Sequence, residues 1–517
     1  MNRMKLLTIK ESITLDQKTI EQKLVSGNEL MRRAGSKIAT HLKKLIASKK
    51  ISRDILLIAG KGNNGGDVFA TSYYLKKEGL NPSIILITLK KNLKGSSLFH
   101  FKKLPDNISL KTATSPLQFE KLINKFKGDI IVDGILGSGF KPPLKDFYSE
   151  VIQCINKQQK LTVSIDIPSG LNTSHTTSKK AGITADITLT IGSLKKEMIS
   201  VPSINYCGRI YPLDIGFPEK IIDTFNPEAD VFTQSDLKNS LNKRKRNSHK
   251  GTFGHALLIG GQFGFTGALI LAAKGAMHTG VGLSTLCSPS DRSRDIFHTS
   301  INEIMTIDFE TIIKSKNLQN YLNKFQAICI GPGLGQDTKS KLLLTKILKL
   351  KNLKLILDAD ALNMIAKKPV LLKNNSHTII MTPHPGEAAR LLNTSPQIIE
   401  ADRLEAARQL TSKFECTIVL KGANTIVSLK NSQTIHLSGT AAGSQAGMGD
   451  VLAGVITALL AMGYEPVKAS NIGVALTSFS AEKLENKIGP FGFLASRVAQ
   501  EIPKMCLNEK HLFTASL

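Results

Sequence analysis

The chain has 517 residues, more than one ordinary hydrophobic core accommodates, so we expect two or three domains. Hydrophobic residues make up 41% of it and charged residues 21%, which excludes wholesale disorder, and no apolar run reaches the roughly 18 residues that cross a bilayer. The formal net charge of +27 comes from scattered lysines without nucleic-acid-binding motifs, so we expect anionic small ligands and no specific nucleic acid. The basic N-terminus lacks a signal-peptide core, which predicts a cytoplasmic protein that does not bind membranes.

The first half alternates short apolar strands with helical patterns. A glycine turn follows the first strand, and a helix is predicted from about Val68. The predicted strands are Asp54–Ala59, Ser83–Leu89, Ile130–Asp133, Leu161–Asp166 and Ile187–Ile191. Continuously apolar strands between helices are typical of a parallel sheet covered on both faces. We therefore predict a doubly wound α/β domain, in which ligands bind beyond the carboxyl ends of the strands.

The segment Phe217–Ser248 breaks this pattern, with two prolines and few periodic apolar residues. A second α/β series follows it, and no repeat links the two halves. Its predicted strands are Ala256–Ile259, Ala327–Ile330, Leu355–Leu357, Thr378–Met381 and Thr417–Leu420. The sequence therefore predicts two unrelated α/β domains, residues 1–220 and 232–510.

Polar residues gather at three predicted strand ends of the first half. The turn Gly60–Asp67 combines glycines with two asparagines and an aspartate just before a helix, where backbone N–H groups can meet a phosphate. Asp133 and Asp166 end two other strands and are followed by glycine or proline turns. A glycine turn alone is equally a tight turn, and one aspartate alone is equally a helix cap. Together they favour a site at one edge of the sheet.

In this order these segments, with Glu29–Gly35, resemble the N-terminal epimerase domain of the bifunctional NAD(P)H-hydrate repair enzymes. The resemblance implies a Rossmann-like three-layer domain that binds hydrated NADH or NADPH and a potassium ion. It implies that the ion is held by Asn64, Asp133 and Ser169. It also implies a substrate site lined by Asn63, Asn64, Gly65, Gly66, Asp67, Gly137, Ser138, Gly139, Phe140, Lys141, Pro142, Pro143 and Asp166.

Asp166 is the candidate acid/base of this site, because inverting the carbon that bears the hydroxyl group requires proton transfer. One departure from the family pattern is Val68, where a glycine is usual after Asn-Asn-Gly-Gly-Asp. We expect the valine to narrow the turn.

The strongest signal in the second half is the glycine-rich stretch Gly439–Gly454, which runs into an apolar helix with Asp450 in its first turn. N–H groups at such a helix start stabilise a transferring phosphoryl group, and Asp450 is placed to accept the proton of an attacking hydroxyl. Polar or glycine clusters follow four other strands, at Gly331–Gly335, Asp358–Leu362, Thr382–Glu387 and Lys421–Thr425. Read singly, Asp450 is an ordinary helix-start carboxylate and His384 a turn residue; together these segments predict a nucleotide-dependent site.

With His249–Gly261, these segments resemble the ADP- or ATP-dependent NAD(P)H-hydrate dehydratases of the ribokinase-like superfamily. The resemblance implies a ribokinase-like α/β domain that takes Mg²⁺ with ADP or ATP. It implies hydrate contacts from Ala268, Gly333, His384 and Asp450, and nucleotide contacts from Lys421, Gly422, Ala423, Asn424, Thr425 and Gly449. Three residues depart from the usual Thr, Gly and Ser and put the rate or nucleotide preference in question: Gln445, Ala446 and Met448.

The predicted function is nicotinamide cofactor repair by a homo-oligomer. The first domain would epimerise the R and S hydrates of NADH and NADPH, and the second would dehydrate the S form. A vitamer kinase is one alternative, which the extra first domain disfavours. A non-catalytic first domain is another, which Asp133 and Asp166 disfavour. A nucleic-acid-binding scaffold is the third; it would bind duplex in a salt-dependent way without enzyme activity.

Overall fold

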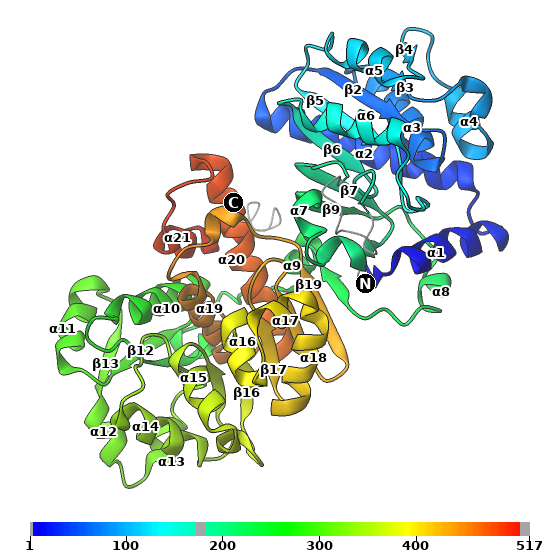
Figure 1. The fold of residues 1–517 in the computed structure, drawn as a ribbon. Coiled ribbons are helices and arrows are strands. Elements are labelled where there is room, and N and C mark those ends of the chain that lie inside the picture. The colour runs from blue at the N-terminus through cyan, green and yellow to red at the C-terminus, as the bar shows by residue number, and fades with distance from the viewer. Residues whose placement is uncertain (1–3, 172–181, 507–517) are drawn as a thin grey trace. The chain divides into compact units, whose positions relative to one another are not determined.

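The computed structural model describes residues 4–171 and 182–506. The chain divides into two compact units, Met1–Asp230 (unit 1) and Val231–Leu517 (unit 2). The predicted domain ends at residues 1–3 and 507–510 lie outside the described residues. Each unit contains one large sheet with helices packed against it (Figure 1). Among the described helices, none combines the length and hydropathy that crossing a bilayer requires.

Unit 1 is built on a seven-stranded, wholly parallel sheet in the order β4-β3-β2-β5-β6-β7-β9. Its strands are β2 (Asp54–Ala59), β3 (Asn81–Leu86), β4 (Ser109–Thr112), β5 (Ile130–Gly134), β6 (Leu161–Ile165), β7 (Ile187–Ile191) and β9 (Arg209–Leu213). The chain builds outward from β2 through β3 and β4, then returns to add β5 on the other side. At such a reversal the connections after the two central strands diverge and leave a crevice for ligands.

Helices cover both faces of this sheet, and the apolar side chains of its strands form a separate core cluster on each face. The longer helices are α1 (Ile9–Glu21), α2 (Gly27–Lys49), α3 (Asn63–Lys77), α5 (Pro116–Ile123) and α6 (Asp146–Asn156), and the shorter ones are α4 (Gly95–Phe101), α7 (Ile204–Cys207) and α8 (Glu219–Ile222). A small two-stranded sheet pairs β1 (Leu6–Leu7) with β8 (Leu194–Lys195). The α/β fold class predicted for the first half is confirmed.

Helix α3 begins earlier than the sequence predicted. It starts at Asn63 rather than near Val68, so the Asn-Asn-Gly-Gly-Asp run forms the first helical turn instead of a loop. Val68 is completely buried in the core. It packs against Gly134, where an added Cβ would lie only 2.2 Å from the valine Cγ2. The unusual valine therefore fills space next to a glycine at the end of β5.

Unit 2 contains a ten-stranded sheet in the order β10-β19-β18-β17-β16-β15-β14-β11-β12-β13. Its strands are β10 (Asp230–Phe232), β11 (His255–Ile259), β12 (Leu283–Ser288), β13 (Met305–Asp308), β14 (Ala327–Ile330), β15 (Lys354–Leu357), β16 (Thr378–Met381), β17 (Thr417–Leu420), β18 (Ile426–Leu429) and β19 (Ser432–His436). The order in which strands are added reverses between β11 and β14, which are parallel. The α/β class is again confirmed, but β18 runs antiparallel to both β17 and β19, because the connection after β17 is too short for a crossover.

Helix α19 begins within the glycine-rich stretch of unit 2 and packs against α10. The helices of this unit are α9 (Gln234–Ser240), α10 (Thr266–Thr279), α11 (Asp291–Ser300), α12 (Phe309–Lys314), α13 (Leu318–Leu322), α14 (Thr338–Leu348), α15 (Asp360–Lys367), α16 (Pro385–Leu392), α17 (Pro396–Ala401), α18 (Arg403–Phe414), α19 (Met448–Ala461), α20 (Pro466–Ile488) and α21 (Ala495–Met505). Helices α10 and α19 cross closely, since a Cβ on Gly454 would lie 1.8 Å from the Ala272 carbonyl oxygen. The segment Phe217–Ser248, which lacked periodicity, holds the short elements α8, β10 and α9.

Candidate active sites

Oxygen atoms converge in unit 1 where the connections after β2 and β5 part. The buried Asn64 donates from Nδ2 to the Leu136 carbonyl at 3.0 Å, and its buried Oδ1 has no hydrogen-bond partner among the described residues. The Ser169 hydroxyl donates to Asp133 Oδ1 at 2.5 Å and also lies 3.0 Å from the Leu136 carbonyl. Asn64 and Ser169 therefore both contact the Leu136 carbonyl, and Ser169 also contacts Asp133. The three residues predicted to hold a cation thus lie together.

Asp133 is the most enclosed carboxylate of this group, fully buried at the end of β5. Its Oδ2 accepts from the Ser164 hydroxyl at 2.8 Å and from the Ser169 N–H at 2.9 Å. Burial raises the pKa of Asp133, and the hydrogen bonds from Ser169, Ile135 and Ser164 offset part of that rise. A cation beside it would favour the ionised form.

Asp166 follows β6 with a backbone φ of 67°, a left-handed conformation that is uncommon for a residue other than glycine. Its Oδ1 lies 2.5 Å from the Nζ of Lys195, an almost completely buried lysine. The Lys195 ammonium also donates to the Thr190 hydroxyl at 3.0 Å and to the Ile191 carbonyl at 2.8 Å. The candidate acid/base is therefore held by an ammonium group that the sequence did not reveal.

Two more carboxylates share this environment. Asp67 is buried in the first turn of α3, and its pKa is raised well above the usual value by burial and by the charges of Asp166 and Asp16. Burial and Asp166 also raise the pKa of Asp16 on α1, while Lys195 lowers it. One ammonium thus faces three carboxyl groups, and the repulsion among their charges adds to the raised pKa values of Asp67 and Asp16.

The other predicted substrate residues of unit 1 border this group. Asn63 is exposed at the start of α3, while Gly65 and Gly66 are buried in its first turn. An added Cβ on Gly137 would lie 3.2 Å from Asn64 Cβ. The loop Ser138–Pro143 continues from there and is half-buried to exposed.

In unit 2, Asp450 lies in the first turn of α19, half-buried rather than turned into the core. Burial raises the pKa of Asp450 to about 7; the charges of Asp358 and Glu387 add to the rise, and Lys421 opposes it. The Lys421 ammonium lies 2.7 Å from Asp358 Oδ1 and 3.8 Å from Glu387 Oε2. A proton acceptor with a pKa near neutrality thus lies beside a compact charged cluster.

His384 caps α16, accepting at Nδ1 from the Gly386 N–H at 3.0 Å. Burial lowers the pKa of His384, and the positive charges of Lys421 and Arg390 lower it further. The imidazole is therefore neutral at physiological pH, and its Nε2 lies 3.5 Å from Glu387 Oε1.

Ala268 and Gly333 lie together where the connections after β11 and β14 diverge. An added Cβ on Gly333 would lie 3.3 Å from the Ala268 side chain. The two connections are hydrogen-bonded, because the Gln262 N–H donates to the Gly333 carbonyl at 2.7 Å. Ala268 is in the first turn of α10, the helix that packs against α19, which carries Asp450.

The predicted nucleotide loop, Lys421–Thr425, connects β17 to β18. Gly422 and Ala423 are exposed, and the Nδ2 of Asn424 is buried without a hydrogen-bond partner. An added Cβ on Gly449 would lie 3.2 Å from Lys421 Nζ, so the loop adjoins the start of α19. The loop therefore offers an unused donor next to the glycine-rich turn.

The three departures from the family pattern lie around this turn. Gln445 and Ala446 are exposed, whereas Met448 packs its side chain against the small apolar cluster that contains Phe493 and Val498. Met448 therefore leaves the backbone N–H groups uncovered and contributes no hydroxyl to the site.

Sequence reasoning missed Lys195 and Asp16 entirely. It also did not single out Asp358 and Glu387, although both lie in polar strand-end segments. The sequence could have identified both, since Asp358 directly follows a predicted strand and Glu387 follows the turn after another. Lys195 had no such signal, because it lies in a two-residue strand outside any motif.

Comparisons with known proteins cover both units. A family model described as NAD(P)H-hydrate dehydratase matches residues 256–504, and one described as YjeF-related protein N-terminus matches residues 27–197. The bifunctional NAD(P)H-hydrate repair enzyme Nnr of Moorella thermoacetica is 30% identical over 516 residues, with 98% of this chain and 97% of that protein covered. The protein of the same name from Coxiella burnetii is 31% identical over 475 residues, with 91% and 93% covered.

Among solved structures, the ADP/ATP-dependent NAD(P)H-hydrate dehydratase from Bacillus subtilis, co-crystallized with ATP/Mg²⁺, is 27% identical to this chain. Its TM-score is 0.48, and the match covers 53% of this chain and 96% of that one.

Proposed function

Because the chain belongs to the family of bifunctional NAD(P)H-hydrate repair enzymes, we propose that its two units repair one metabolite in succession. Unit 1 carries the epimerase and unit 2 the nucleotide-dependent dehydratase. The finer proposal is that unit 1 interconverts the R and S hydrates around Asp166, and that unit 2 dehydrates the S form with Asp450 as the base. Assembly into a homo-oligomer and location in the cytoplasm stay predictions.

The dehydration proposal depends on one observation, the half-buried Asp450 carboxylate whose pKa is raised to about 7 at the start of α19. Asp450 accepts the proton of the C6 hydroxyl, and that oxygen attacks the terminal phosphorus of the nucleotide. The nucleotide leaves shortened by one phosphate. The lone pair of the ring nitrogen then expels phosphate from C6, and the resulting iminium ion loses its C5 proton, which restores the dihydropyridine. A base with a pKa near the working pH is partly ionised yet strong enough to accept the proton.

Binding of the nucleotide is supported by the donors around Asp450. The Asn424 amide and the N–H groups at the start of α19 are available to phosphate oxygens or the adenosine. Asp358 and Glu387 provide hard oxygen atoms of the kind Mg²⁺ prefers. In the described residues no group of three or more metal-ligating side chains is assembled, which fits a metal that enters with the nucleotide phosphates. Such an ion would neutralise phosphate charge.

Epimerisation is assigned to the carboxyl groups around Lys195. The Lys195 ammonium orients the Asp166 carboxylate, which exchanges a proton with the hydroxyl-bearing end of the hydrate. Burial and the charge of Asp166 raise the pKa of Asp67, so Asp67 holds a proton more tightly than an exposed carboxyl group and can return it. A carboxyl group that favours its protonated form, beside an ion-paired carboxylate, is suited to acid/base catalysis.

The potassium ion of the family fits unit 1 on one specific observation. The Oδ1 of Asn64 is a buried acceptor with no partner, beside Asp133 and Ser169. A cation held by these three residues would satisfy that oxygen and balance the buried Asp133 carboxylate. Its chemistry would be electrostatic, favouring binding of the anionic hydrate.

A recovery assay tests the assignment. Mixed hydrate epimers are incubated with the protein, Mg²⁺ and either ADP or ATP, and the return of dihydronicotinamide absorbance is followed. The wild type is expected to convert the whole mixture, and Asp450→Asn to lose dehydration by about 10² to 10⁴-fold. Dehydration at the wild-type rate by Asp450→Asn, or without any nucleotide, would overturn the proposal.

A further inference from the structure

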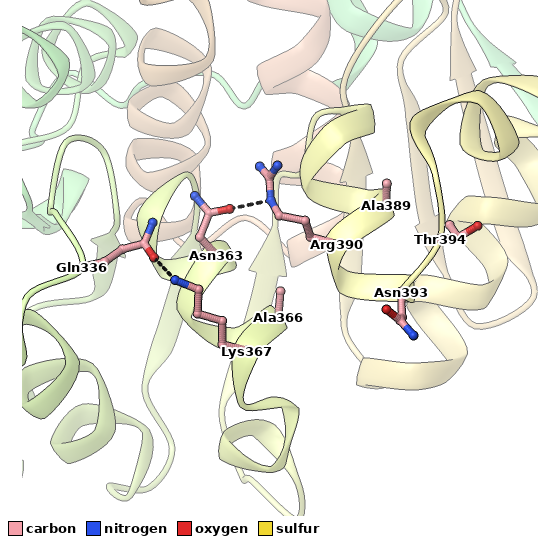
Figure 2. Close-up of a pocket in the computed structure, with 8 residues that line it drawn as sticks. All are labelled: Gln336, Asn363, Ala366, Lys367, Ala389, Arg390, Asn393 and Thr394. Carbon is pink, nitrogen blue, oxygen red and sulfur yellow. Dashed lines mark hydrogen bonds between the residues drawn. The ribbon is translucent and has the colours of Figure 1, made fainter.

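A groove of about 610 Å³ lies between α15 and α16 in unit 2 (Figure 2). We call it the tail groove; the residues that matter for its chemistry are Gln336, Asn363, Lys367, Arg390 and Asn393. Its lining contains two cations, three side-chain amides, one threonine and two alanines, and no carboxylate. This composition favours an anionic ligand.

The two cations of the tail groove are held by neutral amides. Arg390 Nε donates to Asn363 Oδ1 at 2.9 Å, and Lys367 Nζ donates to Gln336 Oε1 at 2.7 Å, as Figure 2 shows. Within residues 4–171 and 182–506, neither forms an ion pair with a carboxylate, and both side chains are exposed. Their charge is therefore available to a ligand, and these hydrogen bonds fix where the donors point.

The tail groove adjoins the residues proposed to contact the hydrate. A Cβ on Gly386 would lie 2.9 Å from His384 Cε1 and 3.9 Å from Arg390 Nη1, so the guanidinium is a near neighbour of the imidazole. At the other wall, the Gly335 N–H donates to Asp360 Oδ2 at 2.8 Å, which fixes the backbone between Gly333 and Gln336. The groove thus begins where the hydrate site ends.

We propose that the tail groove binds the phosphate-bearing tail of the hydrate while its C6 hydroxyl lies against Asp450. This inference rests on the dehydratase function proposed for unit 2. The hydrate keeps the pyrophosphate of the cofactor, and the NADPH form adds a 2′-phosphate. A guanidinium and an ammonium are strong donors to phosphate oxygens. Binding of the tail then holds the reacting hydroxyl in place for transfer.

A second basic cavity, of about 390 Å³ in unit 1, lacks these properties. Its lining includes Arg32 and Arg33, but both form ion pairs with Glu29, at 2.6 Å and 2.9 Å. Asp214 lines it as well, so a negative charge is already present. The two cavities therefore differ in their acids: Asp214 lines the cavity in unit 1 and Glu29 pairs with its arginines, whereas no carboxylate lines the tail groove.

The test is the steady-state dehydration of S-NADHX and of S-NADPHX with ATP and Mg²⁺. Lys367→Met and Arg390→Met are compared with wild type, with Arg390→Lys as a charge-retaining variant and Lys349→Met as a control at another exposed lysine. Each methionine variant is expected to raise KM for the hydrate roughly tenfold, with kcat and KM for ATP unchanged. Arg390→Lys should recover part of the loss, and the control should match wild type.

The two hydrates separate the possible anions. A rise in KM for both assigns the groove to the pyrophosphate, and a rise for the NADPH form alone assigns it to the 2′-phosphate. Unchanged KM for both hydrates, or a rise in KM for ATP only, overturns the proposal. Equal Tm values for variants and wild type show that folding is not the cause. If wild type dehydrates neither hydrate, the proposed function falls and the tail groove assignment with it.

Discussion

Each unit places a lysine against an aspartate at its site, with more carboxyl groups nearby than one ammonium can balance; the lysine of unit 1 is buried and that of unit 2 is partly exposed. In unit 1 the pair is Lys195 and Asp166, and in unit 2 it is Lys421 and Asp358. The difference lies in which carboxyl group is the proposed catalyst. Asp166 is itself the partner of the lysine, whereas Asp450 forms no ion pair with any residue that the structure describes and has a pKa raised to about 7.

This difference matches the two reactions. An epimerase passes a proton and recovers it within one cycle, so an ion-paired acid/base next to Asp67, whose pKa is raised, suffices. The dehydratase must remove a proton from an alcohol while a phosphoryl group is transferred, which needs a free base.

Asp166→Asn is expected to have the largest effect, and it tests whether the two sites work separately. We expect epimerisation to fall on the order of 10²-fold, because the amide cannot exchange a proton as the carboxylate does. Dehydration of purified S hydrate should keep its wild-type rate. Epimerase and dehydratase rates are measured separately on single epimers. A parallel loss of both activities would contradict the separation of the two sites.

The buried lysine of unit 1 is tested through stability. Lys195→Met leaves Asp166, Asp67 and Asp16 without their shared cation, so unit 1 should lose about 3 kcal/mol of unfolding free energy. The neighbouring Lys196→Met removes only an exposed pair with Glu228 and should cost less than about 1 kcal/mol. Chemical denaturation of both variants measures the difference. Equal losses would mean that Lys195 is not the centre of the cluster.

The pH dependence of unit 2 follows from Asp450. Since burial raises its pKa to about 7, dehydration measured as kcat/KM should rise about tenfold per pH unit below 7 and level off above it. The raised pKa also means that the folded state binds this proton more tightly, so its contribution to stability falls as pH rises from about 4 through 7. Asp450→Asn should remove that fall. A dehydration rate that is flat from about one and a half pH units below 7 to about half a unit above it would exclude Asp450 as the base.

Potassium gives the smallest expected effect and should act on unit 1 alone. Replacing K⁺ by Na⁺ is expected to slow epimerisation several-fold, because the smaller ion fits the oxygens of Asn64, Asp133 and Ser169 less well. Dehydration should not change. Ser169→Ala should abolish the difference between the two ions, and equal sensitivity of both activities would contradict the assignment.

The sequence predicted the parts of both sites that local patterns encode. Short apolar strands followed by glycine or proline turns located Asp133 and Asp166, and a glycine-rich stretch before an apolar helix located Asp450. In the structure β5 ends one residue after Asp133 and β6 ends just before Asp166. In a parallel sheet the carboxyl ends of the strands lie at one edge, so the sequence also allowed the prediction that Asn64 and Ser169 lie near Asp133.

What the sequence did not predict depends on long-range pairing. Lys195 reaches Asp166 from β8, which is held by only two residues of β1 near the N-terminus, Leu6 and Leu7. The polar strand β19 was missed because alternation in Ser432–His436 is too weak to distinguish it from a loop. The raised pKa of Asp450 is a property of burial and of Asp358 and Glu387 together, which no single segment contains.

Mixing two variants that each lack one of the two activities tests the central claim, that each unit carries a complete and separate site. Asp166→Ala alone should recover only one epimer from a mixture with Mg²⁺ and ATP, and Asp450→Asn should recover almost none. Combined in one tube, they are predicted to convert both epimers completely, because the hydrate released by one chain is a substrate for the other. Recovery of only one epimer by the mixture would contradict the account.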